Sequence, residues 1–324
     1  MSVGEFDLIA RWFTRPARRA VVGIGDDCAL WAPTPGQQLA VSSDMLVEGR
    51  HFLSTVAPDK LGHKALAVNL SDLAACGATP RAFMLALALP RVDARWLDGF
   101  ARGLFALADA HEIELIGGDT TAGPLNICIT AFGEVPPGQA LLRAGACAGD
   151  RIWVSHPVAG GVGDARLALE AFRGTVTLAG DAFDAARARM ECPTPRVALG
   201  VALRGVATAA IDISDGLAGD LGHVLARSGV GATLDADALP ASALLAAQPE
   251  ALRRECTLAG GDDYELLFTA PPALDAAVRA AAARAGCAVT PIGRIEAAPG
   301  LRIVDRAGCA IEARFGGFDH FKTP

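Results

Sequence analysis

Aspartates recur at the ends of apolar, strand-like runs along the whole chain, and this pattern constrains the fold more than any other feature. An apolar run predicts a buried strand, and the Gly or Ser that follows it lets the backbone turn sharply. Open α/β architectures bind ligands at the ends of such strands, so we expect the carboxylates to gather there. The runs that show the pattern are residues 21–27, 39–44, 113–119, 210–215 and 258–263.

Carboxylates that gather in one place need a counter-charge. Two bare carboxylates about 4 Å apart repel each other by roughly 4 kcal/mol at an effective dielectric constant near 20. A cation between them removes this repulsion, and hard oxygen ligands favour Mg²⁺, which also binds substrate phosphates. The chain has a net charge of −7, so phosphorylated substrates would need local cations to approach it. The pattern therefore predicts a site for several Mg²⁺ ions and phosphate groups.

Length and composition set the outer limits. The 324 residues are enough for two domains with full cores. The acidic balance gives no reason to expect nucleic-acid binding, and no stretch reaches the roughly 20 apolar residues that a membrane span needs. None of the eight cysteines forms a C-x-x-C pair. Reduced thiols in a cytoplasmic protein are therefore expected rather than a disulfide framework.

Helical and strand-like segments alternate through both halves of the chain, which predicts an α/β or α+β fold. Proline and glycine at residues 136–138 and a tight connector at residues 145–150 interrupt the pattern. We therefore expect an N-terminal domain of residues 1–145 and a C-terminal domain of residues 146–324. Helices are predicted at residues 5–13, 59–75, 93–111, 164–172 and 273–285, and after Pro195 and Asp215; strands are predicted between residues 21 and 44 and at residues 82–89, 114–116, 125–135, 151–155, 209–213, 233–234 and 289–295.

Two acidic positions stand out in local context. Asp72 lies in an otherwise apolar helical segment, where a carboxylate must be paired or bind a metal because burying it alone is costly. In residues 42–44, alternation along an extended segment directs Ser42 and Asp44 to one face and Ser43 to the other. Asp72 and Asp44 are therefore candidate metal ligands.

The other signals have ordinary alternatives when each is taken alone. Asp27 and Asp119 could belong to glycine turns, and Asp215 could cap a helix whose N–H groups also suit a phosphate. His51 and Arg143 could be surface residues. No Ser-His-Asp or Cys-His order stands out, so nothing indicates a covalent nucleophile.

Six ordered motifs carry more information together. They are GIGDDCAL at residues 23–30, SSDMLVEGRHF at 42–52, KALAVNLSDLAA at 64–75, LIGGDTT at 115–121, AIDISDGL at 210–217 and GGDDYEL at 260–266. In this order they resemble the thiamine-monophosphate kinase family, within the superfamily of aminoimidazole ribonucleotide synthetase. The resemblance runs from Gly4 to the GFDHF of residues 317–321.

The resemblance implies a reaction and an architecture. The reaction is direct transfer of the γ-phosphate of ATP to thiamine monophosphate, with several Mg²⁺ ions and no phosphoenzyme. The architecture is a two-domain PurM-like fold. Its N-terminal domain pairs with its twin in a homodimer, and its C-terminal domain closes over the nucleotide.

The resemblance also implies site residues, matched position by position. Asp44, Asp72 and Asp212 correspond to acidic residues central to catalysis. The metal-binding positions are Asp27, Ser42, Ser43, Asp44, Asp72, Asp119, Asp212 and Asp215; the ATP-binding positions are Gly118, Asp119, Arg143 and Ser214; the substrate-binding positions are His51, Asp262 and Phe315. Ser43 stands where Thr is common in the family, and Asp262 stands where the longer Glu is common.

Three other functions are compatible with the same acidic motifs. One is another ATP-using enzyme of the aminoimidazole ribonucleotide synthetase superfamily. The second is a magnesium-nucleotide sensor without catalytic turnover. The third is a metal-dependent phosphohydrolase, which would release free phosphate without an acceptor.

Overall fold

The computed structural model describes residues 4–312, 315–318 and 321, and the chain forms two compact units. The first unit runs to Leu73 and continues with Ala78–Gly138, and the second contains Ala74–Gly77 and the chain from Gln139 onward. Asp319 and His320 of the C-terminal motif lie outside the described residues.

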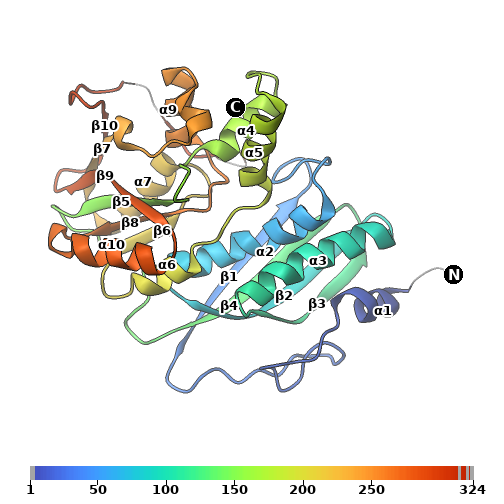
Figure 1. The fold of residues 1–324 in the computed structure, drawn as a ribbon. Helices are drawn as coiled ribbons and strands as arrows, with labels where there is room; N and C mark the ends of the chain where they lie inside the picture. The colour runs from blue at the N-terminus through green and yellow to red at the C-terminus, as the bar shows by residue number, and fades with distance from the viewer. Residues whose placement is uncertain (1–3, 313–314, 319–320, 322–324) are drawn as a thin grey trace. The chain divides into compact units, whose positions relative to one another are not determined.

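The first unit is built on a four-stranded sheet with the strand order β1-β4-β2-β3 (Figure 1). Strands β2 and β3 run parallel, and the β1–β4 and β2–β4 pairs are antiparallel. The elements are α1 (Glu5–Leu8) with a π-helical turn (Ile9–Phe13), β1 (Gln38–Val47), α2 (Pro58–Ala75), β2 (Thr79–Leu89), α3 (Ala94–Ala110), β3 (Glu114–Ala122) and β4 (Asn126–Val135).

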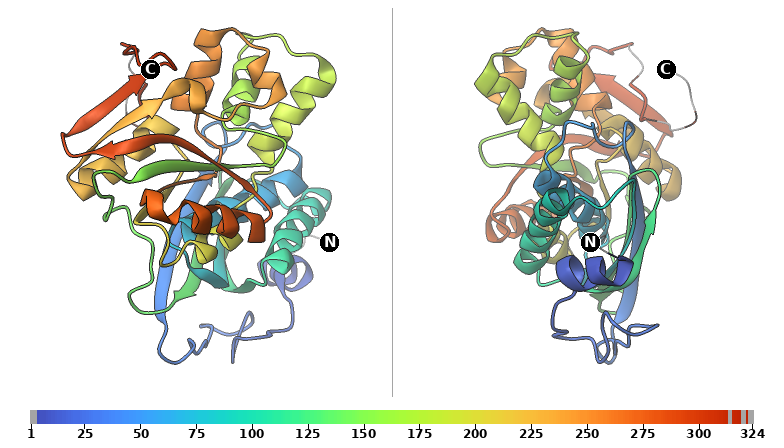
Figure 2. Two further views of the ribbon diagram at one scale, coloured as in Figure 1. Left: turned by 60° about the vertical axis from the view of Figure 1, so that its left-hand side comes forward. Right: turned by 90° about the vertical axis from the view of Figure 1, so that its right-hand side faces the viewer.

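Helices α2 and α3 lie side by side over one face of this sheet (Figures 1 and 2). Their apolar residues and the inward side chains of the strands form the core; Leu66, Phe83 and Phe100 are fully buried. Alternate residues of the same strands point away from the helices, and Met84 is 40% exposed there. The sheet therefore has one face covered by helices and one open face.

Glycines let the two helices approach until their backbones touch. A Cβ atom on Gly103 of α3 would lie 1.7 Å from the carbonyl oxygen of Asp59, and one on Gly62 of α2 would lie 2.1 Å from the carbonyl oxygen of Phe100. No side chain fits in such a gap. These two glycines, one on each helix, therefore set how closely the helices approach.

The second unit contains a six-stranded sheet with the order β10-β7-β9-β5-β8-β6. Strands β10 and β7 are parallel, and the other neighbouring pairs are antiparallel. The elements are β5 (Arg151–His156), α4 (Asp164–Phe172), α5 (Gly180–Glu191), α6 (Val197–Ala202), β6 (Ala209–Asp212), α7 (Leu217–Ser228), β7 (Gly231–Asp235), α8 (Ala243–Ala246), α9 (Glu250–Ala259), β8 (Leu266–Ala270), α10 (Asp275–Arg284), β9 (Ala288–Glu296) and β10 (Gly300–Val304).

Helices cover both faces of this second sheet. Ile152 and Val154 of β5 belong to the same buried cluster as Leu221 of α7. Trp153, between them in the strand, faces the other side, where the guanidinium of Arg279 from α10 lies 5.2 Å from the centre of its ring. The alternation along β5 thus places α7 on one face and α10 on the other.

The prediction of a two-domain α+β fold is confirmed, but some positions within it were predicted wrongly. Asp44 lies inside β1 rather than at its end. Asp119 lies inside β3, because Gly117 and Gly118 continue this strand instead of turning it. Residues 21–30 form an isolated bridge between Val22 and Leu30 in place of a strand pair. The sequence pattern also missed α5, α8, α9, β8 and β10, and the strand-like run predicted from residue 258 begins with the last two residues of α9.

The eight cysteines are free thiols, and Cys28, Cys147 and Cys309 are exposed. No helix in the described part of the chain has both the length and the apolarity that crossing a bilayer requires.

Substituting Gly103→Ala should destabilise the first unit by about 1–3 kcal/mol, because the added methyl group overlaps the backbone of α2. The matched control is Gly222→Ala in α7, where a Cβ would have no atom within 4 Å. There, the better helix propensity of Ala should stabilise the protein by about 0.5–1 kcal/mol. Urea unfolding followed by circular dichroism measures both changes, and a shift of the same sign in both variants would contradict the close helix contact.

Candidate functional site

The first group of candidate residues lies where β1 meets α2. The Ser42 hydroxyl donates a hydrogen bond to Asp72 Oδ2, and the backbone N–H of Asp44 donates to Asn69 Oδ1 at 3.2 Å. Asn69 and Asp72 are three residues apart, on one side of α2. The structure therefore brings Ser42 and the backbone of Asp44 together with Asp72 and its neighbour Asn69. Sequence analysis missed Asn69, although its spacing from Asp72 was a usable signal.

Ser43 points to the opposite, open face of the sheet, as the alternation predicted. Its hydroxyl lies 2.9 Å from Thr130 Oγ1 of β4. Asp119 pairs with Ala86 of β2, and Ala86 pairs in turn with Cys128 of β4. Paired residues point to the same face, and Cys128 shares the face of Thr130, two residues along β4. Asp119 is therefore also on the open face. Two strands lie between β1 and β3, a separation of roughly 14 Å at ~4.8 Å per strand. The side chains of Ser43 and Asp119 are therefore not brought together with Ser42 and Asp72.

A cavity of about 980 Å³ lies on the open face, next to β3. Its lining includes the N-terminal helical turns, the loop that carries Asp27, and Gly118 and Asp119 of β3. Ligand pockets for small molecules commonly measure about 300–1,000 Å³. The cavity thus brings Asp27 together with Gly118 and Asp119, which lie about ninety residues later in the sequence, and it has the volume that a nucleotide requires.

Gly118 is fixed by packing at this cavity. Its φ is +148°, and a Cβ atom would lie 1.8 Å from the carbonyl oxygen of Leu85 in β2. A residue with any side chain would push β3 away from β2 at this point. The glycine therefore keeps the backbone of β3 flat against its neighbour and accessible from the cavity.

His51 is oriented by its own turn. Its Nδ1 accepts the backbone N–H of Val47 at 3.0 Å, so this nitrogen carries no proton and the neutral ring is protonated at Nε2. The buried ammonium group of Lys64 donates to the carbonyl oxygen of His51 at 3.0 Å. These contacts hold both the ring and the backbone of His51 in place.

In the second unit, the candidate residues converge on one backbone junction, residues 212–216. Asp212 is the last residue of β6, and beyond it the chain pairs with the segment before β8. The N–H of Ile213 donates to the carbonyl oxygen of Glu265 at 2.8 Å, and the N–H of Asp262 donates to that of Ser214 at 2.9 Å. The strand ladder thus extends past Asp212 and holds Ser214, Asp215 and Asp262 next to one another.

Two further segments approach this junction. The carbonyl oxygen of Asp215 accepts the N–H of Phe318 at 2.9 Å, and half-buried Phe315 packs against the core cluster of the unit. The carbonyl oxygen of Leu142 accepts the N–H of Ala210 in β6 at 2.9 Å, so exposed Arg143 lies beside the strand that ends in Asp212. The Ser228 hydroxyl, at the end of α7, donates to the carbonyl oxygen of Arg143 at 3.2 Å.

Asp220, which sequence analysis missed, closes the turn at the junction. Its Oδ2 accepts the N–H groups of Ser214, Asp215 and Gly216 at 3.1, 3.2 and 3.1 Å. The N–H groups of the turn before α7 therefore bind a carboxylate of the chain itself. Burial and the nearby charge of Asp215 raise the pKa of Asp220 to about 7, although the three hydrogen bonds act in the opposite direction. The sequence signal that could have identified Asp220 is its place four positions after Gly216, the glycine of the turn.

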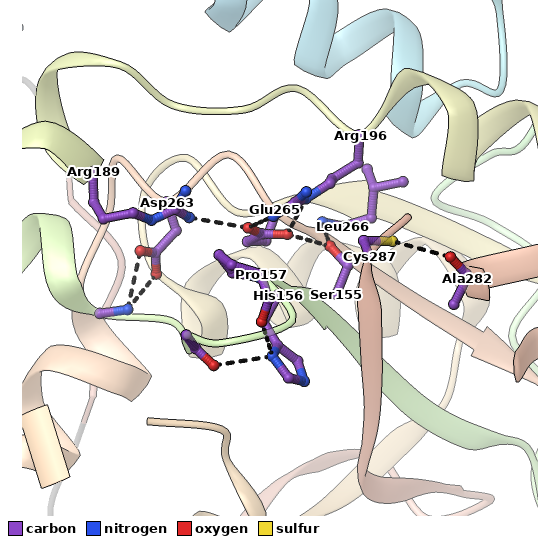
Figure 3. Close-up of polar contacts among 12 residues, drawn as sticks. Ser155, His156, Pro157, Arg189, Arg196, Asp263, Glu265, Leu266, Ala282 and Cys287 are labelled. Atoms are coloured by element: carbon purple, nitrogen blue, oxygen red, sulfur yellow. Dashed lines mark hydrogen bonds and ion pairs between the residues drawn. The ribbon is translucent and has the colours of Figure 1, made fainter. Parts of the chain in front are cut away.

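The segment 261–265 is anchored by a buried ion network (Figure 3). Glu265 is fully buried, and its carboxylate accepts hydrogen bonds from Arg189 at 3.0 Å and from Arg196 at 2.5 and 2.6 Å. The Ser155 hydroxyl donates to the same carboxylate at 2.5 Å. Breaking such a pair by removing one partner typically costs about 3–5 kcal/mol, so this segment is held firmly.

Most candidate metal ligands thus occupy three places: the β1–α2 contact, the cavity beside β3 and the junction in the second unit. Ser43 lies apart from them, next to Thr130 on the open face of the sheet. Among the residues that the structure describes, no group of three or more His, Cys, Asp and Glu side chains is close enough to hold a metal ion. A metal ion bound here would need other oxygen donors, such as serine hydroxyls and ligand phosphates. Mg²⁺ fits this donor set, because it is usually bound by one or two carboxylates together with substrate phosphates.

Comparison with protein families identifies both units. Residues 25–135 match the model of the AIR synthase related protein, N-terminal domain, and residues 148–306 match that of the AIR synthase related protein, C-terminal domain. The thiamine-monophosphate kinase of Salmonella typhimurium is 46% identical over 331 residues, covering 100% of each chain.

Two solved structures resemble this chain over most of its length. The thiamine-monophosphate kinase of Stenotrophomonas maltophilia K279a has a TM-score of 0.84 and 45% identity, covering 94% of this chain and 95% of that one. AaThiL complexed with AMPPCP and TMP has a TM-score of 0.75 and 29% identity, covering 90% and 89%.

The raised pKa of Asp220 predicts how stability depends on pH in the absence of divalent cations. Between the ordinary pKa of 3.8 and the folded value of about 7, the unfolded chain has lost the proton that the folded chain still holds. The free energy of unfolding should therefore fall with rising pH in this window, by up to about 1.4 kcal/mol per pH unit, and level off above it.

Asp220→Asn keeps an oxygen acceptor but cannot ionise, so this part of the fall should be missing. Urea unfolding in EDTA at intervals from pH 5 to pH 8 measures the difference between the two proteins. Parallel pH profiles for the wild type and the variant would show that Asp220 ionises normally.

Proposed function

The chain belongs to the thiamine-monophosphate kinase family, and on this basis we propose that it transfers the γ-phosphoryl group of ATP to thiamine monophosphate, giving ADP and thiamine diphosphate. The observation that carries the proposal is 46% identity to a kinase of this name over the full length of both chains. This identity over the full length favours the phosphorylation of thiamine monophosphate over the other ATP-using reactions of the superfamily.

We propose that the acidic and hydroxyl groups of both units bind Mg²⁺. The ligands would be Asp27, Ser42, Ser43, Asp44, Asp72, Asp119, Asp212 and Asp215, and several ions would be bound during turnover. The adjacent oxygens of Ser42 and Asp72 support this set, since both are the hard donors that Mg²⁺ prefers. When bound, Mg²⁺ neutralises the negative charge that accumulates between the two phosphates.

ATP would occupy the cavity beside β3, in contact with Gly118 and Asp119. Arg143 and Ser214 would bind it from the second unit. A guanidinium group can hold two phosphate oxygens at once through its planar fork, and exposed Arg143 is accessible for such a contact.

Thiamine monophosphate would bind to His51, Asp262 and Phe315. The ring of Phe315 offers an apolar surface on which a heterocycle can stack, and the carboxylate of Asp262 suits a cationic thiazolium or an amino group. The imidazole ring of His51 suits an anionic group of the substrate. Both ends of the substrate would thus meet complementary side chains.

The transfer itself would be direct and in line. Phosphoryl transfer depends on positioning and charge neutralisation, and covalent help from a side chain is unnecessary. Asp44, Asp72 and Asp212 would have the central role, since they bring the charge-neutralising groups to the phosphates. The fixed contacts of β1 with α2, and of β6 with the segment before β8, supply the rigidity that such positioning needs.

We also propose that the protein works as a cytoplasmic homodimer. Residues 1–145 would bind the metal ions and ATP and pair with a second copy, and residues 146–324 would close over the nucleotide and substrate. The open sheet face supports pairing, because beside the cavity it exposes Val41 and Met45 at 59% and 54%. Free thiols throughout the chain agree with a reducing compartment.

One assay tests the proposed reaction. The protein is incubated with Mg²⁺, ATP and thiamine monophosphate, and the products are separated by chromatography. Thiamine diphosphate and ADP in equal amounts support the kinase. Free phosphate without thiamine diphosphate would indicate a phosphohydrolase, and ATP binding without turnover would indicate a sensor.

Asp72→Ala should lower kcat by about 100-fold or more, because a ligand of the Mg²⁺ that neutralises the phosphate charge would be lost. The matched control is Asp59→Ala, which removes a half-exposed carboxylate from the first turn of the same helix. Its kcat should stay within about twofold of the wild type, since exposed ion pairs contribute little. Near-normal turnover of Asp72→Ala at saturating Mg²⁺ would rule out its role in metal binding.

Unphosphorylated thiamine should be a poor acceptor, with kcat/KM about 100-fold or more below that of thiamine monophosphate. It lacks the phosphate that would be held in line with ATP, so the positional advantage is lost. Initial rates with both acceptors at equal concentration provide the measurement. Comparable rates would mean that the acceptor phosphate is not part of the recognition.

A further inference from the structure

The segment from Gly261 to Glu265 divides its side chains between two directions. Asp263 and Glu265 point into the unit, where both are buried. Asp262 and Tyr264 are joined to each other, because the Tyr264 hydroxyl donates a hydrogen bond to Asp262 Oδ1 at 3.1 Å. One set of side chains therefore anchors the segment, and the other forms a hydrogen-bonded pair.

The inward acids fix the segment at two points (Figure 3). The carboxylate of Glu265 is held by Arg189, Arg196 and Ser155. The carboxylate of Asp263 accepts the N–H of Gly163 with both oxygens, at 3.0 and 2.8 Å. The backbone between these anchors has little freedom to move.

The backbone of Asp262 and Tyr264 adopts an uncommon conformation. Their φ angles are +65° and +50°, in the left-handed region that bulky residues such as Tyr rarely enter. The N–H of Tyr264 donates to the carbonyl oxygen of Ile213 at 2.8 Å, and the N–H of Asp262 donates to that of Ser214. Such conformations persist where the surroundings impose them, and they concentrate at ligand sites.

We propose that Tyr264 is a positioning residue for substrate recognition: its hydroxyl fixes the carboxylate of Asp262 in the orientation that receives the thiamine moiety of the acceptor. This rests on the proposed function, which puts Asp262 in contact with the acceptor. Tyr264 itself is buried, at 8% exposure. Without the hydroxyl, the carboxylate loses a hydrogen bond that orients it, and more of its ordering must accompany substrate binding.

Tyr264→Phe removes only the hydroxyl and keeps the buried ring. The KM for thiamine monophosphate should rise about 5- to 10-fold, because ordering the freed carboxylate when the substrate binds opposes association. The kcat and the KM for ATP should change less than about twofold, since neither the metal ligands nor the nucleotide contacts are altered. An unchanged KM for thiamine monophosphate would overturn the proposal.

Two further variants separate positioning from general loss of structure. Thr269→Val removes a hydroxyl that bonds Thr208 at 2.7 Å at the far end of β8, and it should leave the KM for thiamine monophosphate unchanged. Asp262→Gly removes the carboxylate while allowing the positive φ. In that background, Tyr264→Phe should have no additional effect on KM; a full additional effect would show that Tyr264 acts independently of Asp262.

The chain contains a single tyrosine, which gives a direct readout on the wild-type protein. Incorporating 3-fluorotyrosine yields one ¹⁹F resonance, which should shift when thiamine monophosphate is added and stay in place when ATP is added alone. If the protein phosphorylates thiamine monophosphate but the ¹⁹F chemical shift does not change at saturating thiamine monophosphate, the positioning role of Tyr264 is overturned and the proposed function stands. A wild-type protein that makes no thiamine diphosphate overturns the proposed function, and the positioning role with it.

Discussion

The hydrogen bonds that continue the β6–β8 ladder beyond Asp212 are the interaction on which the second half of the site depends. Ile213 and Ser214 pair with residues 262–265, and this pairing holds two segments together that lie about fifty residues apart in sequence. The turn that follows is closed by Asp220 through three N–H groups. A backbone fixed in this way can hold acidic side chains close to one another, where a flexible loop would let them separate.

Each acidic side chain of the segment 262–265 that is turned into the unit has a specific compensation. Glu265 is paired with two arginines, and Asp263 accepts a backbone N–H with both oxygens. Burial nevertheless raises the pKa of Asp263 well above its ordinary value. The protein thus uses buried acids to hold the segment in place. The acids at the junction itself, Asp212 and Asp215, are those for which we propose Mg²⁺ as the counter-charge.

The sequence predicted elements whose pattern is local. Helices α3 and α4 and strands β4 and β5 were found because their apolar residues recur with a clear period. Asp119 was placed wrongly, because two glycines indicate a turn when only the sequence is considered. In the sheet, Gly118 instead allows β3 to lie against Leu85, a contact that depends on the neighbouring strand. Asp220 and Tyr264 escaped notice for the same reason, since their hydrogen-bond partners are defined by folded turns. The motif order indicated the family, which periodicity alone could not do.

We have proposed that carboxylates of the first unit and carboxylates of the second unit each bind metal ions together with substrate phosphates. Mn²⁺ accepts the same oxygen ligands as Mg²⁺, and its free concentration can be measured by electron paramagnetic resonance. The most direct measurement counts the Mn²⁺ ions bound in the presence of a non-hydrolysable ATP analogue and thiamine monophosphate. We expect Asp72→Ala, in the first unit, and Asp212→Ala, in the second, each to bind fewer ions than the wild type. Full wild-type occupancy in either variant would contradict the metal binding proposed for that unit.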